Sequence, residues 1–196
     1  MRPIVAIIGN GGLAKDDARG FLAHAMGRAL VDAGYRVACG GLGGIMESAC
    51  LGASSSPAHR DGDVIGILPG FDPSAANEGV DIALATGLDQ ARNFIVANSD
   101  AVIAIGGGAG TLSEMAAAWQ LQRLLIAFRV QGWSGRMADT RIDERCRYPD
   151  MPEDRVHGAD TPQDAIDLLR RWLPKYDLRH PGIPRRRPAW PSEGRS

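Results

Sequence analysis

The chain has 196 residues, a formal net charge of −1, and 44% hydrophobic against 23% charged residues, which predicts one globular domain with a single core. No run of 18 apolar residues occurs, and the N-terminus enters a strand without a cleavable signal pattern, so we expect a cytoplasmic protein and no membrane span. A nearly neutral or acidic body argues against nucleic acid as the main partner.

The charge is unevenly distributed along the chain. From residue 175 onward six basic residues stand against two acidic ones, a formal +4, which leaves −5 for residues 1–174. The same terminal segment holds four prolines, Pro181, Pro184, Pro188 and Pro191. We therefore predict a single ligand-binding domain over residues 1–174 and an extended or disordered Pro/Arg-rich tail over residues 175–196.

The cysteines and histidines indicate no metal site. Three cysteines form neither a C-x-x-C motif nor a disulfide framework and are interpreted as buried small hydrophobes: Cys39, Cys50 and Cys146. Four histidines have no metal-ligand spacing: His24, His59, His157 and His180.

Strands and helices alternate along the chain. Strands are expected at Pro3–Ile8, Arg36–Cys39, Val64–Leu68, Asp81–Ala85, Ala101–Ile105, Leu124–Phe128 and near Val156. Helices are expected from Asp16 or Asp17 to Ala33, from Ile45 past Leu51, from about Asp89 to Asn98, from Thr111 to Leu121 and from about Pro162 to Leu173. This alternation predicts an α/β, doubly wound, Rossmann-like fold with a mostly parallel sheet and helices on both faces.

Glycines follow five of the predicted strands. They are Gly9, Gly40-Gly41, Gly70, Gly87 and Gly106-Gly107. Because the carboxyl ends of parallel strands meet at one edge of the sheet, these glycine-rich loops should lie together at the edge where open α/β sheets bind ligands.

The stretch Ala101–Gln120 carries the strongest signal. A buried strand stops at Gly106-Gly107-Gly108, and Thr111 with Glu114 has the spacing of a capping box at the start of a helix. Unpaired N–H groups between Gly106 and Thr111, together with the helix dipole, favour a bound phosphate. The alternative is a tight turn with nothing bound.

The sequence lacks the residues that several familiar enzyme classes need. The second strand ends in Cys39-Gly40, where a dinucleotide-binding fold would place an acidic residue for the ribose. Neither Lys15 nor Lys175 stands in a G-K-[ST] context, which excludes a Walker A nucleotide triphosphatase and disfavours a pyridoxal phosphate enzyme. No G-x-S-x-G motif offers the nucleophile of an α/β-hydrolase.

Two charged residues are candidates for chemistry at the same edge. Arg92 falls in the first turn of its predicted helix, where a cation meets the positive end of the dipole unless an anion compensates. Glu114 would face the same edge, where a carboxylate can hold a ribose hydroxyl or act as acid or base. The structural alternatives are that Arg92 lies across the surface or pairs with Asp89, and that Glu114 has a purely capping role.

In order along the chain, four motifs resemble one superfamily. They are Gly40-Gly41-Leu42-Gly43-Gly44-Ile45-Met46-Glu47, Ile67-Leu68-Pro69-Gly70, Ala91-Arg92-Asn93 and Gly106-Gly107-Gly108-Ala109-Gly110-Thr111-Leu112-Ser113-Glu114. Over about residues 3–173 the chain is similar to the Rossmann-like proteins that contain the LOG phosphoribohydrolases, often called lysine decarboxylase-like, and the molybdenum-cofactor carrier proteins.

The resemblance assigns roles to residues. The hydrolase motif is P-G-G-x-G-T-x-x-E, preceded by an Arg-Lys pair. Its arginine and glutamate match Arg92 and Glu114, which would be catalytic in an enzyme. Gly106 replaces its proline and Asn93 its lysine, and these forms are closer to the carrier branch. The implied ligand-binding set is Gly9, Gly11, Gly41, Gly43, Gly44, Pro69, Gly70, Arg92, Asn93, Gly107, Gly108, Gly110, Thr111 and Glu114.

Three functions share this site. The resemblance favours a carrier or binding protein for the molybdenum cofactor, a pterin held by its phosphate without reaction. The alternative is a phosphoribohydrolase that splits a nucleoside 5′-monophosphate into free base and ribose 5-phosphate and requires no cofactor; a nucleotide sensor is a third. The apolar helix Thr111–Leu121 and the resemblance both favour a homodimer or homotetramer.

Overall fold

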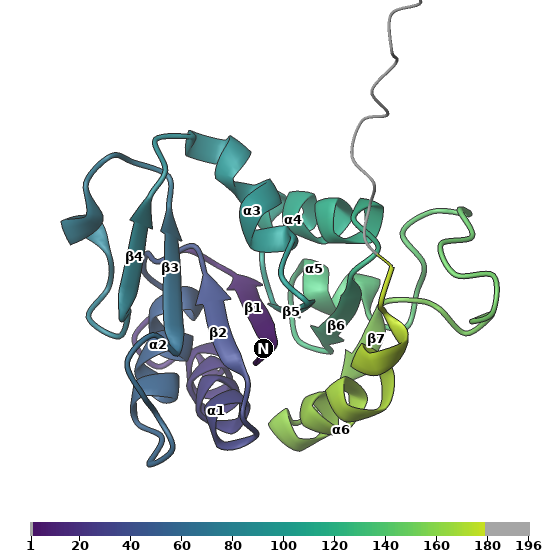
Figure 1. Cartoon of the computed structure of the whole chain (residues 1–196), viewed down its shortest axis with the longest axis horizontal. Coiled ribbons are helices and arrows are strands. Elements are labelled where there is room, and N and C mark those ends of the chain that lie inside the picture. The colour runs from purple at the N-terminus through teal and green to yellow at the C-terminus, as the bar shows by residue number, and fades with distance from the viewer. Residues whose placement is uncertain (1, 179–196) are drawn as a thin grey trace, which may run out of the picture.

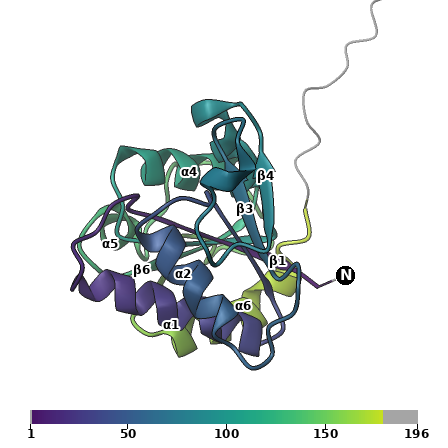
Figure 2. The same ribbon diagram turned by 90° about the vertical axis from the view of Figure 1, so that its left-hand side faces the viewer.

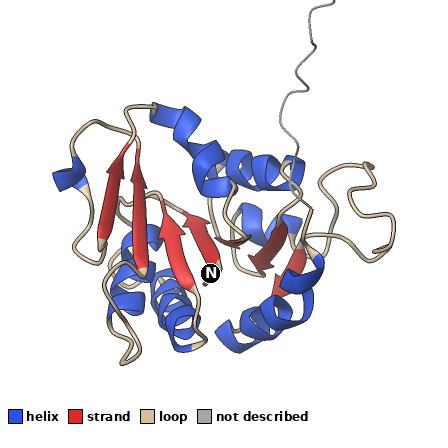
Figure 3. Cartoon of the chain, in the orientation of Figure 1, coloured by secondary structure: helices blue, strands red, loops and turns tan. Residues whose placement is uncertain are grey.

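The computed structural model describes residues 2–178, whose strands form one seven-stranded parallel sheet in the order β4-β3-β2-β1-β5-β6-β7 (Figures 1 and 3). The strands are β1 (Ile4–Gly9), β2 (Arg36–Cys39), β3 (Val64–Leu68), β4 (Ile82–Ala85), β5 (Ala101–Ile105), β6 (Leu124–Phe128) and β7 (His157–Ala159). The chain winds outward from β1 to β4, crosses back to β5 on the other side of β1, and winds outward again. The predicted doubly wound α/β fold is confirmed.

Helices cover both faces of the sheet, as Figure 2 shows from the side. The α-helices are α1 (Ala18–Asp32), α2 (Ile45–Ser54), α3 (Asn93–Ala97), α4 (Ala109–Gln120), α5 (Trp133–Met137) and α6 (Pro162–Trp172). Short 3-10 helices are η1 (Pro73–Ala75), η2 (Asp89–Arg92) and η3 (Leu173–Lys175). Helices α1, α2 and α6 lie on one face, and α3, α4 and α5 on the other (Figures 1 and 2).

Successive residues of each strand point to opposite faces, so the sheet has two cores. In β1, Val5 and Ile7 join the cluster that packs α1, α2 and α6, whereas Ala6 and Ile8 join the cluster that packs α3 and α4. Every residue of β5 is fully buried. Burial on both faces explains why this strand is a continuous apolar run.

Two segments differ from the helices that the sequence predicts. Asp89–Asn98 is not one helix: η2 precedes α3, and Asp89, with a positive φ of 47°, is not a cap. The Gly- and Arg-rich segment after β6, for which the sequence predicts no helix, contains α5. Both elements are too short for side-chain periodicity to reveal them.

The C-terminal end of α4 is held by a buried arginine. Arg147 donates to both carboxylate oxygens of Asp154, at 2.9 and 2.6 Å, and to the backbone oxygens of Trp119 and Arg123, at 3.2 and 3.1 Å. Its guanidinium carbon lies 3.5 Å from the centre of the Trp119 ring. A cation at the last carbonyls of a helix is favourable for the dipole, so Arg147 fixes this end of α4.

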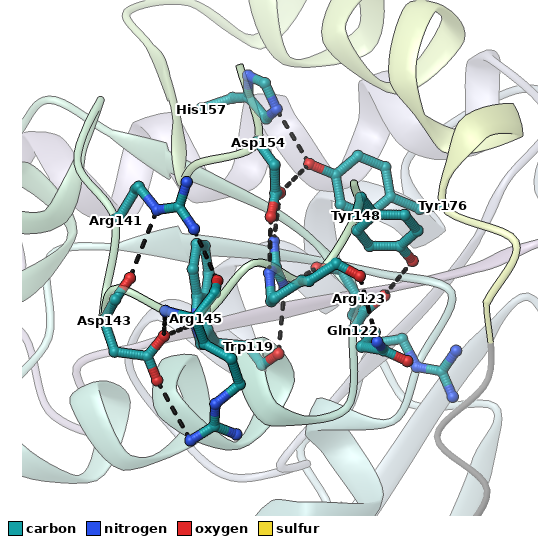
Figure 4. Close-up of polar contacts among 11 residues, drawn as sticks. Trp119, Gln122, Arg123, Arg141, Asp143, Arg145, Tyr148, Asp154, His157 and Tyr176 are labelled. Carbon is teal, nitrogen blue, oxygen red and sulfur yellow. Dashed lines mark hydrogen bonds and ion pairs between the residues drawn. The ribbon is translucent and has the colours of Figure 1, made fainter. Parts of the chain in front are cut away.

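The same cluster extends to the end of the described chain (Figure 4). The hydroxyl of Tyr176 donates to Asp154 at 2.6 Å and lies 3.3 Å from Nε2 of His157. Burial lowers the pKa of His157 to about 4, so this ring is neutral at pH 7. Because Tyr176 is itself buried, the packed chain extends past residue 174, and the tail from residue 179 lies outside the described residues.

The three cysteines have two different environments. Cys39 and Cys50 are buried with their sulfurs 3.3 Å apart, as free thiols. Cys146 is exposed, so the expectation of burial is wrong for this residue, which lies in the surface segment between α5 and β7. Within residues 2–178 no helix has the length and apolar character needed to cross a membrane.

Candidate functional site

The site lies where the strand order reverses. Strands β1 and β5 are neighbours, with Gly9 opposite Ile105, yet their connections leave toward opposite halves of the sheet, which opens a crevice at their carboxyl ends. A side chain at Gly9 would meet the Ile105 carbonyl oxygen at 2.4 Å. The close approach of the two strands therefore requires glycine at this position.

The glycine turn after β5 is left-handed and internally braced. Gly106 and Gly107 have φ values of 64° and 94°, which glycine adopts without strain. The Gly106 N–H donates to Oγ of Ser134 and the Gly107 N–H to Oδ1 of Asn10, both at 2.7 Å. These two N–H groups, which we expected to face a phosphate, are therefore used to hold the turn.

The helix after the turn begins earlier than predicted. Its N-cap is Gly108, in an extended conformation and without a side-chain hydrogen bond, and Ala109 and Gly110 are already helical. Thr111 and Glu114 thus lie inside α4, and the predicted capping box is wrong. Because the first N–H groups of a helix have no partner within it, the exposed start of α4 keeps donors for an anion.

A cavity of about 200 Å³ opens beside this helix start. Seven of the predicted ligand-binding residues line it: Gly9, Gly11, Arg92, Asn93, Gly110, Thr111 and Glu114. The lining also includes apolar residues from β1, from the loop before α2 and from α2 itself, namely Ile7, Ile8, Leu42 and Met46, as well as Gly40 and Gln90.

The other predicted residues lie around this cavity and do not line it. Gly107 and Gly108 form the turn, and Gly44, with a φ of 68°, is the N-cap of α2. Gly43 precedes it, and Gly41 approaches the backbone of Gly66 in β3. Pro69 and Gly70 follow β3, where the Pro69 oxygen accepts the Asp89 N–H at 3.1 Å.

The cavity contains one incompletely paired arginine. Nη1 of Arg92 lies 3.8 Å from Oε1 of Glu114, close enough for attraction but too far for a hydrogen bond. That nitrogen is buried and has no hydrogen-bond partner among the described residues. Gly40 makes room for the guanidinium, because a Cβ there would lie 2.2 Å from Nη1. The alternative, a pair of Arg92 with Asp89, is not formed.

Glu114 is a buried carboxyl with an altered acidity. Burial raises its pKa to about 7, although the charge of Arg92 opposes this shift. Near neutral pH the group is therefore partly protonated and can act as donor or acceptor. Its neighbour Asn93 is also buried and donates through Nδ2 to Gln90 at 3.5 Å and Ser113 at 3.3 Å.

The chain matches one family along most of its length. A model of the SLOG cluster4 family matches residues 2–166. The chain belongs to the SLOG cluster4 family. It is also 38% identical, over 115 residues, to an uncharacterised protein of Archaeoglobus fulgidus, a match that covers 58% of this chain and 72% of that protein.

Solved structures extend the family similarity to the fold. The molybdenum cofactor binding protein from the phototrophic bacterium Rippkaea orientalis is 32% identical, with a TM-score of 0.71 over 87% of this chain and 96% of that chain. The molybdenum cofactor carrier protein from Chlamydomonas reinhardtii is 26% identical, with a TM-score of 0.70 over 89% and 99%. The resemblance of this SLOG family chain to the superfamily of LOG and molybdenum-cofactor carrier proteins is thereby confirmed.

Sequence reasoning missed three residues that shape the site. Asn10 and Ser134 brace the glycine turn, and Gly40 seats Arg92. Asn10 stands in the loop after β1 and Gly40 after β2, so strand-end position was a usable signal for both. Ser134 comes from a segment without a recognisable pattern, and only the fold brings it to Gly106. Among the described residues, no group of three or more His, Cys, Asp or Glu side chains is arranged to hold a metal ion.

Proposed function

We propose that this SLOG family protein binds a phosphate-bearing, nucleotide-like ligand at the cavity beside α4, and that it acts as a carrier or binding protein for the molybdenum cofactor in the cytoplasm. The observation that carries the proposal is Arg92, which lines the cavity and whose Nη1 is buried without a hydrogen-bond partner among the described residues. An unsatisfied buried donor is costly, and a ligand anion would satisfy it.

The ligand's phosphate would lie on the N–H groups at the start of α4, with Arg92 as its counter-charge. The small size of the cavity, about 200 Å³, suits a phosphate and its adjoining group rather than a whole cofactor, since complete ligand pockets exceed roughly 300 Å³. The similar Rippkaea and Chlamydomonas proteins support the molybdenum cofactor as the ligand.

A phosphoribohydrolase is the second candidate, and Glu114 is the observation that favours it. A carboxyl with a pKa of about 7, at 3.8 Å from an arginine, is suited to proton transfer at neutral pH. Glu114 would then position or activate water, and Arg92 would stabilise charge while the bond between base and ribose breaks. No protein cofactor is needed for that reaction.

One experiment separates the two candidates. Protein purified from its native cells is analysed by native mass spectrometry for a bound ligand. Wild type and Glu114→Gln are then incubated with nucleoside 5′-monophosphates, and the release of free base is followed by chromatography. A carrier holds a cofactor-sized ligand and releases no base. Turnover by wild type that Glu114→Gln lowers by about 100-fold or more, with affinity little changed, would establish the hydrolase instead.

We also propose a homodimer or homotetramer, on a different surface from the one expected. Met115 and Trp119 are buried within one subunit, so the apolar face of α4 is not free. Exposed apolar side chains lie instead on the edge strand β4 and on α3: Ile82, Leu84, Phe94 and Ile95. Light scattering should give more than the 20.8 kDa of one chain; a monomer at micromolar concentration contradicts this.

A further inference from the structure

A second cavity, of about 430 Å³, lies against the loop after β1, between α1 and α2; Figure 2 shows these two helices packed on the same face of the sheet. The two cavities are separated by little more than one loop. Gly11 and Met46 line the first, and their chain neighbours Gly12 and Glu47 line the second. A ligand held at α4 and passing over the Gly11-Gly12 turn would enter the second cavity.

The walls of the second cavity combine apolar and polar groups. Phe21, 67% exposed, and Leu51, 42% exposed, are large apolar side chains open to solvent at its edge. Lys15, Glu47 and Ser48 also line it, and within residues 2–178 their side chains form no hydrogen bond or ion pair. Apolar walls with a few convergent polar groups are typical of sites for small ligands.

The chemistry of these walls suits a flat heterocycle. The Phe21 ring offers a face on which an aromatic ring can stack. The Glu47 carboxylate can accept two adjacent N–H groups, which strengthens and orients the contact. The 2-amino-4-oxopyrimidine edge, shared by pterins and guanine, presents such a pair of donors, whereas adenine presents a donor beside an acceptor.

We propose that the cavity between α1 and α2 binds the heterocyclic ring of the ligand, and that Glu47 selects a ring with the 2-amino-4-oxopyrimidine edge. This inference rests on the proposed function, because it uses the phosphate site at α4 as the other anchor of the same molecule. Glu47 determines specificity and Phe21 provides stacking; neither carries out a reaction.

The test compares four probes by calorimetric titration: neopterin monophosphate, guanosine 5′-monophosphate, adenosine 5′-monophosphate and ribose 5-phosphate. Wild type should bind the first two at least about tenfold more tightly than the last two, as a bidentate contact and a stacked ring allow. Of the first two probes, the one that binds more tightly shows whether a pterin or a guanine ring fits the cavity better.

Two variants remove the features of the second cavity, and both side chains are exposed. Glu47→Gln should abolish the preference over adenosine 5′-monophosphate, and Phe21→Ala should weaken the ring-bearing probes about fivefold or more. Neither should change the affinity for ribose 5-phosphate. Glu78→Gln, an exposed acid outside the cavity, is the matched control and should change nothing.

The two proposals fail differently. If Arg92→Ala weakens all four probes while Glu47→Gln and Phe21→Ala leave every affinity unchanged, the ring site is refuted and the phosphate site stands. If Arg92→Ala changes no affinity, the proposed function is refuted, whatever Glu47→Gln does.

Discussion

Each end of α4 holds an arginine beside a buried carboxylate, and the two pairs are built differently. At the C-terminal end, Arg147 makes two short hydrogen bonds to Asp154 and two more to backbone oxygens. At the N-terminal end, Arg92 and Glu114 stay 3.8 Å apart, and Nη1 has no hydrogen-bond partner among the described residues. We call the first pair saturated, because its arginine has its hydrogen-bond partners within the fold, and the second unsaturated. A saturated pair holds the fold, whereas an unsaturated pair keeps a charged donor for a ligand.

The surroundings of the two carboxyl groups reflect the same difference. Near Arg92, burial outweighs the arginine and raises the pKa of Glu114 to about 7. Near Arg147, the Tyr176 hydroxyl donates to Asp154 at 2.6 Å, which supplies the carboxylate with a third donor. Charge is therefore compensated at one end of α4 and left available at the other.

The largest effect is expected when Arg147 is removed from the saturated pair. Arg147→Met should lower the free energy of unfolding by about 3–5 kcal/mol, because it leaves Asp154 buried without its cation. Urea denaturation measures the change. Arg170→Met, which removes an exposed partner of Asp167, is the control and should cost less than about 0.5 kcal/mol. A loss below 1 kcal/mol for Arg147→Met would show that this pair does not hold the fold.

The next effect concerns the unsaturated pair. Arg92→Ala should weaken a phosphate-bearing ligand by roughly 1.5–3 kcal/mol, the range for a hydrogen bond to a charged group. The free energy of unfolding should change by only about 1 kcal/mol, since Glu114 can remain protonated when its cation is removed. Calorimetric titration and urea denaturation of the same preparation test both statements. Unchanged affinity would exclude this role for Arg92.

The smallest effect depends on pH. Folded protein keeps the proton of Glu114 up to about pH 7, whereas the unfolded chain releases it near its ordinary pKa of about 4.3. The folded state therefore binds more protons in this window, and the stability that Glu114 contributes is lost as pH rises toward 7. The Glu114→Gln variant has no carboxyl group at this position, so its stability does not fall in this way.

Relative to wild type, Glu114→Gln should thus gain roughly 1–3 kcal/mol of stability between pH 5 and pH 8. Urea denaturation at the two pH values measures the gain, with Glu78→Gln as an exposed control. The same stability difference between Glu114→Gln and wild type at both pH values would mean that the folded protein does not raise the pKa of Glu114.

The sequence by itself determined the seven strands and the ends of four of them. β2, β3, β5 and β6 have the predicted bounds, because a strand covered on both faces is a mostly apolar run, which ends here at glycine, proline or arginine. The position of Arg92 and Glu114 at one edge followed from the same alternation. These are local patterns joined by one topological rule.

Capping shows where local pattern stops being sufficient. Thr161 and Asp164 form a capping box at α6. The same Thr-x-x-acid spacing at Thr111 and Glu114 does not, because α4 begins at Ala109 and both residues lie inside it.

Only the tertiary structure decided that Asn10 and Ser134 hold the glycine turn, that Gly40 admits the guanidinium of Arg92, and that Glu114 is buried with a raised pKa. The reason is physical: propensity and capping act within a few residues, whereas burial, pKa and hydrogen-bond saturation depend on which distant segments the fold brings together.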